Sequence, residues 1–245
     1  VCRYELNRLL SRYPRSSCNS TTPCQCGDVL VQSRTLNSSD FTVWPCAGIG
    51  LEIGAPGITL DCNGIPITGS LSGDGIINTF DNVTIKNCNV SKFANGIHVL
   101  GAYNNTIINN TVSSTILVPG STGIWIETST NSSIKLNNAA SYQWGLGFDT
   151  NSDNNRAEGN TLFSCQYGID LYNSSGNTIK NNIANNNTLY GIWLRHGSSN
   201  NRLTGNTASY NSQHGLSISD TVSIKNTIRN NRFCSNNQAG GMFYD

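Results

Sequence analysis

Ionisable and aromatic side chains recur at two alternating positions of a short strand pattern, Gly-apolar-x-apolar-x, whose x side chains point away from the apolar ones. Aromatic rings stack on the apolar faces of sugars, and neighbouring carboxylates can act as acid and base or bind Ca²⁺. The pattern therefore predicts a polysaccharide-binding face. Its substrate-binding candidates are Trp125, Trp193, Tyr172, Glu127 and His98, and its catalytic candidates are Asp170, Asp149 and Arg195.

The same residues also have a purely structural interpretation. Outward aromatic side chains stack along any parallel sheet, and Asp170 with Arg195 could be an ordinary cross-strand pair worth less than about 1 kcal/mol. The connections between strands are short, whereas a deep active-site cleft needs longer loops. The sequence therefore leaves an enzymatic function as an alternative but favours a non-catalytic protein without a cofactor. If a metal binds, Ca²⁺ is the candidate.

The strand pattern belongs to a repeat with a period in the low twenties. The first glycine recurs with successive steps of 21, 27, 22, 23, 23, 24 and 26 residues, at Gly75, Gly96, Gly123, Gly145, Gly168, Gly191, Gly215 and Gly241. A second series has its own 27-residue step at the same place, at Cys88, Asn110, Asn137, Asn160, Asn182, Asn206 and Asn231. One insertion around Ile116 to Ser121 accounts for both long steps, and a fixed period of this size indicates a solenoid.

The units contain short β-branched runs and no helical periodicity, which predicts an all-β fold, a right-handed parallel β-helix of about eight coils with three strands per coil. Its narrow core is built from columns such as Ile85, Ile107, Ile134, Ala157, Ile179, Leu203 and Ile228. The asparagines of the second series are expected to form an inward amide ladder at one corner, with Cys88 in the place of an asparagine in an earlier coil.

From about Cys26 onward the units resemble the right-handed parallel β-helix repeats of pectate-lyase-like proteins, polysaccharide epimerases and periplasmic NosD-type proteins. The opening segment from Gly57 to Gly64, GITLDCNG, resembles the first coil of many secreted proteins of this group. The resemblance implies the fold and a place outside the cytoplasm. It implies no particular chemistry, because this superfamily hosts many activities and no complete catalytic motif is present.

The start of the chain differs from the repeats. Arg3 to Tyr13 places apolar residues at helical spacing before Pro14, which predicts a short helical cap within an N-terminal segment of residues 1–26, ahead of a β-helix at residues 27–245. The chain contains nine cysteines, which points to an oxidising compartment. Disulfides are expected among Cys2, Cys18, Cys24, Cys26, Cys46 and Cys62, whereas Cys165 and Cys234 are candidates for free thiols.

The composition limits the classes of partner that the chain is expected to bind. The net charge is +1 and only 12% of residues are charged, so neither a nucleic acid nor an anionic membrane surface is expected. No apolar run reaches membrane-spanning length, and a start at Val1 fits removal of a signal peptide. We expect a secreted or cell-surface protein with glycosylation sequons at Asn19, Asn37, Asn82, Asn89, Asn104, Asn109, Asn131, Asn173 and Asn186.

Two functions follow as hypotheses. The first is a structural protein that associates with itself end to end into an extracellular filament or sheath, because the chain is nearly all scaffold with low charge. The alternative is a protein that binds or processes an extracellular polysaccharide, as a lyase, epimerase or glycosidase would, through the Trp, Asp and Arg face.

Overall fold

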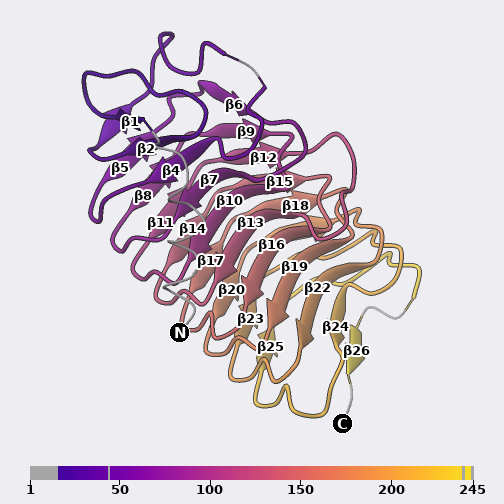
Figure 1. Ribbon diagram of the computed structural model, residues 1–245. Coiled ribbons are helices and arrows are strands. Elements are labelled where there is room, and N and C mark those ends of the chain that lie inside the picture. The colour runs from indigo at the N-terminus through magenta and orange to yellow at the C-terminus, as the bar shows by residue number, and fades with distance from the viewer. Residues whose placement is uncertain (1–15, 44, 239–240, 244–245) are drawn as a thin grey trace.

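The computed structural model describes residues 16–43, 45–238 and 241–243. These residues form an all-β, right-handed parallel solenoid of about nine turns, where about eight were predicted, and they contain no helix (Figure 1). The predicted helical cap at Arg3 to Tyr13 and the predicted disulfide cysteine Cys2 lie outside the described residues. No helix in the described residues has the length and apolar character needed to cross a membrane.

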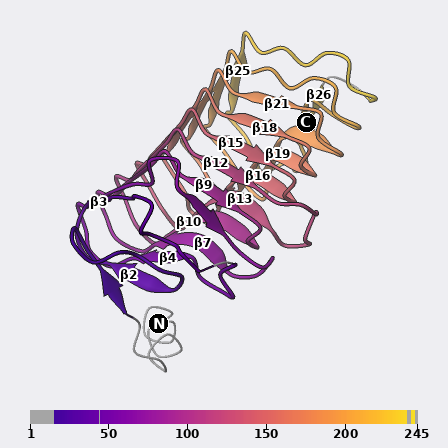
Figure 2. The ribbon, with the colours of Figure 1, turned by 90° about the horizontal axis from the view of Figure 1, so that it is seen from above.

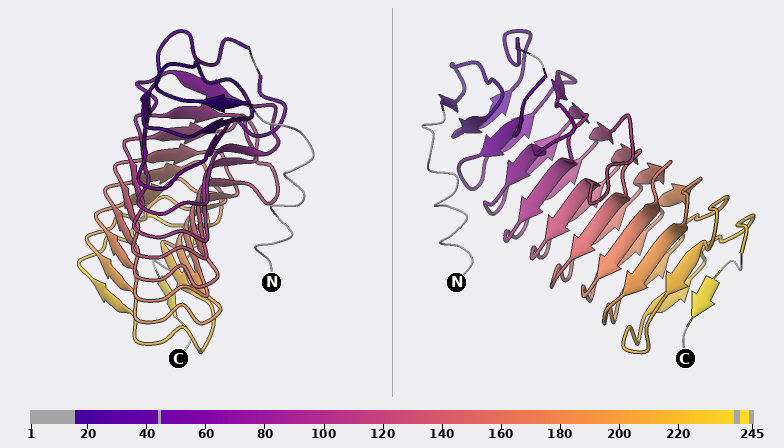
Figure 3. Two further views of the ribbon diagram at one scale, coloured as in Figure 1. Left: turned by 60° about the vertical axis from the view of Figure 1, so that its left-hand side comes forward. Right: turned by 45° about the vertical axis from the view of Figure 1, so that its right-hand side comes forward.

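The strands form three parallel sheets, and each of the central turns contributes one strand to every sheet, whereas the turns at either end contribute to fewer. The eleven-stranded sheet consists of β1 (Ser17–Cys18), β2 (Asp28–Leu30), β4 (Leu51–Ile53), β7 (Asp74–Asn78), β10 (Asn95–Leu100), β13 (Thr122–Glu127), β16 (Trp144–Asp149), β19 (Tyr167–Tyr172), β22 (Tyr190–Arg195), β24 (Leu216–Ile218) and β26 (Gly241–Phe243). Its strands lie side by side along one whole side of the molecule, from the violet end to the yellow end (Figure 3).

The two other sheets have shorter strands. The nine-stranded sheet consists of β3 (Arg34–Thr35), β5 (Thr59–Asp61), β8 (Thr84–Lys86), β11 (Thr106–Ile108), β14 (Ser133–Lys135), β17 (Arg156–Glu158), β20 (Thr178–Lys180), β23 (Arg202–Thr204) and β25 (Thr227–Arg229). The six-stranded sheet consists of β6 (Pro66–Thr68), β9 (Asn89–Ser91), β12 (Thr111–Ser113), β15 (Asn138–Ala140), β18 (Thr161–Phe163) and β21 (Ile183–Asn185). Seen from above, successive turns stack into an elongated body (Figure 2).

The bend between the nine-stranded and six-stranded sheets carries the predicted asparagine ladder. Asn137 donates its side-chain amide to Asn160 Oδ1 at 3.0 Å, and Asn160 donates to Asn182 Oδ1 at 2.9 Å. The same oxygens accept the backbone N–H of the preceding rung, and each amide also reaches a backbone carbonyl inside the bend. The amides and backbone N–H groups of these rungs are thus satisfied by neighbouring coils, which confirms the predicted ladder.

Three further buried polar ladders were not predicted. One runs through Asn155, Asn177 and Asn201, and another through Asn187 and Asn211. A third uses serine hydroxyls, in which Ser129, Ser152, Ser174 and Ser198 each accept the backbone N–H of the preceding coil. These columns recur at the same period as the predicted one, so the sequence contained the signal for them.

The apolar core follows the predicted columns and is narrow. The column from Ile85 to Leu203 is fully buried, while Ile228 on β25 is only partly buried. The recurring glycine has a steric cause. A Cβ at Gly145 would lie 2.7 Å from the carbonyl oxygen of Gly168 in the next coil, so a side chain there would push the coils apart.

Disulfides and an ion pair hold the first turns. The disulfides join Cys18 to Cys24, Cys26 to Cys46 and Cys62 to Cys88. Cys24 and Cys26 therefore belong to different disulfides. Cys88, which was expected only as a ladder position, is a disulfide partner as well. It still donates its backbone N–H to Asn110 Oδ1 at 2.9 Å, which makes it the first rung. Cys165 and Cys234 are free thiols.

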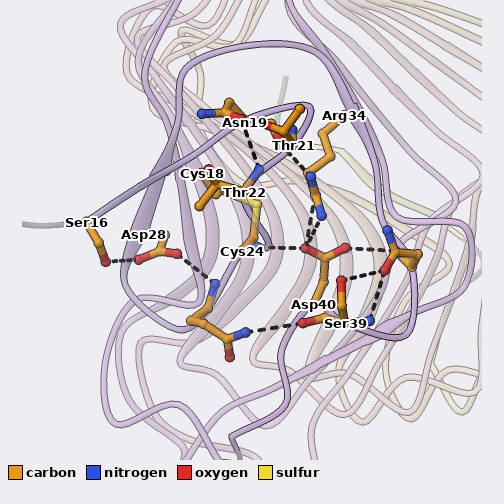
Figure 4. The surroundings of a disulfide bond; sticks show 12 residues. Ser16, Cys18, Asn19, Thr21, Thr22, Cys24, Asp28, Arg34, Ser39 and Asp40 are labelled. Carbon is orange, nitrogen blue, oxygen red and sulfur yellow. Dashed lines mark hydrogen bonds and ion pairs between the residues drawn. A yellow bond between two sulfur atoms is a disulfide. The ribbon is translucent and has the colours of Figure 1, made fainter.

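Beside the first disulfide lies a buried ion pair between Arg34 and Asp40, with a nitrogen–oxygen distance of 2.7 Å (Figure 4). The other bonds of Asp40 go to backbone N–H groups of Cys24 and Asn37. Arg34 also donates to the carbonyl oxygen of Asn19. This network satisfies the backbone of an irregular first turn, where the asparagine ladder is missing.

Candidate functional site

The eleven-stranded sheet brings the predicted site residues to its outer face. Strand register places His98, Trp125, Gly147, Asp170 and Trp193 in one line across β10, β13, β16, β19 and β22. A second line contains Leu100, Glu127, Asp149, Tyr172 and Arg195. Parallel strands lie about 4.8 Å apart, so neighbours in a line are within contact distance. The two lines match the two predicted positions, but their side chains separate into two groups.

The first group surrounds His98, which is 6% exposed. Its Nε2 lies 2.9 Å from Glu127 Oε2, and its Nδ1 lies 3.4 Å from Asp74 Oδ2. Trp125 stacks on the imidazole with a centroid separation of 4.2 Å and an interplanar angle of 8°. Burial opposes the charged imidazole, but the hydrogen bonds and charges of Asp74 and Glu127 outweigh it and raise the pKa of His98 above 6.5.

The second group is centred on Asp170, which is 5% exposed. Arg195 makes a bidentate pair with it, at 3.0 Å and 2.8 Å. The guanidinium lies over Trp193, 4.2 Å from the ring centroid, and over Tyr172 at 4.7 Å. Burial raises the pKa of the Asp170 carboxyl above its ordinary value, and Arg195 opposes that rise. The pair is thus desolvated and braced by aromatic rings, unlike the weak surface pair considered from the sequence.

Gly147 separates the two groups and leaves a hollow of about 130 Å³. The hollow is lined by Trp125 on β13, by Trp144 and Asp149 on β16, by Asp170 on β19 and by Arg195 on β22. One face of Trp125 is covered by His98. Among the described residues no ring stacks on its other face, because the neighbouring residue in the line is Gly147. Trp125 lines the hollow, so the missing side chain leaves part of its surface without a neighbour in this line.

An aromatic row that the sequence analysis missed runs beside this line. It occupies the position just before each recurring glycine, with Trp144, Tyr167 and Tyr190 on adjacent strands. Tyr167 stacks on Trp193 at 4.7 Å and lies 6.3 Å from Trp144 between centroids. Tyr190 is tilted by 54° against Tyr167 at a centroid separation of 5.5 Å, so the row is a series of ring contacts between neighbouring coils. The sequence contains a signal for this row, since the aromatic residue directly precedes the recurring glycine in three successive units.

The predicted carboxylates are not all brought together. Asp149 and Asp170 both line the hollow, whereas Glu127 is turned toward His98. Within the described part of the chain no three His, Cys, Asp or Glu side chains converge as metal ligands. The arrangement supplies one free aromatic face and one closed ion pair, rather than an open pair of carboxylates.

A larger hollow of about 480 Å³ lies elsewhere, at the corner that contains Asn63, Asn87 and Asn109. Asn109 donates to Asn87 Oδ1 at 2.8 Å, and Asn87 donates to Asp61 Oδ1 at 2.9 Å. Its lining consists of turn amides, glycine, threonine and the disulfide-bonded Cys88. Among the residues that the structure describes, none that lines this hollow is titratable, since Cys88 is disulfide-bonded.

The sequon asparagines lie mainly at exposed turns and strand edges. Asn19 is half-buried, and the exposed ones are Asn37, Asn82, Asn89, Asn104, Asn109, Asn131, Asn173 and Asn186. They are separate from the buried ladder asparagines, so a glycan on any exposed one would project into solvent. Glycosylation itself stays a prediction.

Solved structures with the same fold include epimerases and a tailspike protein. The A-module of mannuronan C-5 epimerase AlgE4 from Azotobacter vinelandii superposes with a TM-score of 0.59 at 16% identity, over 92% of this chain and 69% of that one. The periplasmic alginate epimerase AlgG gives 0.59 at 16%, over 82% and 56%. The Dettilon tailspike protein gives 0.65 at 17%, over 98% and 64%. This chain therefore spans less than two thirds of the last two, and the likeness shows the fold alone.

The sequence comparisons agree with the architecture. No curated protein sequence matches the chain. Residues 74–244 match the family described as the right handed beta helix region. The matched range contains the strands from β7 to β26, which is most of the solenoid. The chain belongs to this right-handed β-helix family.

Proposed function

We propose that this chain is an extracellular carbohydrate-binding protein, in which a sugar ring stacks on the free face of Trp125 above Gly147. The observation that carries the proposal is the hollow itself, where a broken repeat leaves an aromatic face without its stacking partner. An apolar ring face next to the polar Asp170–Arg195 pair suits a sugar, which has apolar faces and hydroxyl edges. The fold is shared with alginate epimerases and a tailspike, which supports a carbohydrate ligand.

The size of the hollow favours binding over catalysis. Pockets that enclose a small-molecule substrate measure roughly 300–1,000 Å³, whereas this one measures about 130 Å³. It accepts a single ring or side group of a longer chain. Asp170 is engaged by both of its oxygens with Arg195 and is not available as a free base. We therefore assign no catalytic role to Asp170, Asp149 or Arg195.

The charge of the face favours a neutral glycan over a polyuronate. On strands β7 to β22 the eleven-stranded sheet carries four carboxylates, Asp74, Glu127, Asp149 and Asp170, against the cations His98 and Arg195. A chain with one carboxylate on every sugar would be repelled by the unpaired excess. Neutral hexose or amino-sugar polymers avoid that repulsion.

The test is a panel of neutral and uronate-containing oligosaccharides, measured for binding by calorimetry and for product release by chromatography. We expect binding of a neutral oligosaccharide, no product, and a loss of about tenfold or more in affinity for Trp125→Ala. Phe163→Ala, which removes an exposed aromatic side chain from the six-stranded sheet, serves as the matched control and should bind normally. Binding that survives Trp125→Ala would refute the site. Product release abolished by Asp170→Asn in a folded protein would establish an enzyme instead.

The proposed location is the cell exterior. Three disulfides within the first turns require an oxidising compartment to form and persist. A protein that is retained in the reducing cytoplasm would contradict this location, and fractionation of the native cells with a thiol-reactive label would reveal it.

End-to-end self-association is a second candidate. In the described residues β25 and β26 are the last strands of their sheets, and the free thiol of Cys234 lies nearby and is half-exposed. Strand edges and a free thiol both permit joining to another copy. Sedimentation at micromolar concentration, with and without reductant, decides this. A single species near the 26.4 kDa chain mass under all conditions would end the idea.

A further inference from the structure

The environment of His98 is built for a charged imidazole. Both ring nitrogens face carboxylates that come from different strands, Asp74 on β7 and Glu127 on β13. Asn95 holds Asp74 in place with a hydrogen bond of 2.8 Å to its other oxygen. A neutral imidazole has one donor and one acceptor, so only the imidazolium can donate to both carboxylates.

Among the described strands that pack against β10, no titratable group other than the two carboxylates faces the ring. The strands that pack against β10 are β7, β13, β9 and β12. Asp74 is the titratable residue of β7 and Glu127 that of β13, while β9 and β12 contain none. Asp149 on β16 lies next to Glu127 in the strand register and adds negative charge one strand further away. All of these groups favour the protonated ring.

The stacked tryptophan is the link to the hollow. An imidazolium parallel to an indole at 4.2 Å is held by its charge as well as by contact, and loss of the proton removes the charge component. It also removes a hydrogen bond to one of the two carboxylates. We propose that protonated His98 fixes Trp125 in the wall of the hollow over Gly147, so that the site is ordered below the titration of His98 and loosened above it.

Two consequences follow. His98 is a positioning residue, since it does not line the hollow and acts on it through Trp125. Ligand affinity should fall as the pH rises through the titration of His98, whose pKa lies above 6.5. This second consequence rests on the proposed carbohydrate-binding function, whereas the coupling between His98 and Trp125 does not.

The experiment is an NMR titration of the folded chain that needs no ligand. Protein labelled with ¹⁵N gives an indole N–H resonance for Trp125, assigned with Trp125→Phe, and the His98 ring is followed through its carbon-bound protons. We expect both signals to move with one midpoint above 6.5, a lower midpoint in Glu127→Gln, and no movement of the Trp125 indole in His98→Gln. His196→Gln, which changes an exposed imidazole beside Tyr172, should leave the titration unchanged.

Two outcomes would overturn the inference. One is a Trp125 indole that stays constant while His98 titrates, and the other is a Trp125 indole that titrates equally in His98→Gln. Affinity for a neutral oligosaccharide found in the panel is measured in parallel and should fall about two- to fivefold across the midpoint. If the indole titrates with His98 but no oligosaccharide binds, the coupling stands and the proposed function fails.

Discussion

Two columns of residues run through the same coils, one in a bend and one on the eleven-stranded sheet, and they obey different rules. The buried ladder from Asn110 to Asn231 repeats one residue type, because each coil must satisfy the same backbone groups in the same bend. The outer line from His98 to Ser217 changes residue at every coil and contains one gap, at Gly147. A column that repeats one residue type therefore indicates a structural role that every coil shares. A column that is interrupted indicates a role that belongs to one location on the surface.

The largest expected effect comes from breaking the uniform column. Asn160→Ala removes four hydrogen bonds and leaves buried polar groups of Asn137, Asn182 and Ile134 without these partners. We therefore expect a loss of about 3–5 kcal/mol in the free energy of unfolding. Asn138→Ala, which changes an exposed asparagine of β15, is the matched control and should cost less than about 0.5 kcal/mol. Urea unfolding gives both values. Equal losses would show that the ladder does not carry stability.

An intermediate effect is expected in the outer line. Arg195→Met leaves Asp170 buried and unpaired. Loss of a buried partner costs about 3–5 kcal/mol, and because the Arg195 side chain is 19% exposed we expect about 2–3 kcal/mol at neutral pH. Burial already raises the pKa of Asp170, so the folded variant keeps a proton that the unfolded chain loses near pH 3.8. Its stability should fall as the pH rises through the folded pKa.

Urea unfolding of Arg195→Met at acidic and neutral pH measures this dependence. The double variant with Asp170→Asn has no carboxyl to bury and should recover most of the loss at neutral pH. A single variant whose stability deficit is the same at both pH values would contradict a buried, unpaired Asp170.

The smallest effect concerns His98. A pKa raised in the folded state stabilises the protein fully below the unfolded value of 6.5, and this contribution disappears as the pH rises through the folded value. We expect a change on the order of 1 kcal/mol, absent in His98→Gln. Thermal unfolding across neutral and mildly alkaline pH measures it. A wild-type profile that remains in His98→Gln would assign the dependence to another group.

The sequence predicts the features of the fold that every coil repeats, but not those that occur once. The period, the three strands per coil and the Asn110–Asn231 ladder were predictable, because each repeats a local requirement many times. The Cys62–Cys88 disulfide was not, since Cys88 matched a ladder position and one position cannot reveal a second role. The Arg34–Asp40 network is also beyond prediction from spacing, because it lies in a turn that occurs once.

For the candidate site, the sequence placed the right side chains on one face but not in the right groups. Glu127 lies next to Asp149 in register, yet it turns toward His98, which offers a hydrogen bond. Period-two alternation predicts which face of the sheet a side chain occupies. It does not predict which neighbouring side chain it contacts. The role of Gly147 was not predicted for a related reason. Sequence patterns indicate where side chains lie, whereas the proposed site depends on a position that lacks one.

The central claim is that the break at Gly147 creates the ligand site. A Cβ at Gly147 would lie 3.5 Å from Thr122 and 3.8 Å from Trp125, both ordinary contacts, so Gly147→Thr should fold and fill the hollow. Ala140→Thr, at a half-exposed position of the six-stranded sheet, is the matched control. We predict that calorimetry with a neutral oligosaccharide from the panel shows a loss of about tenfold or more in affinity for Gly147→Thr and none for Ala140→Thr. Unchanged affinity of a folded Gly147→Thr protein would contradict the account.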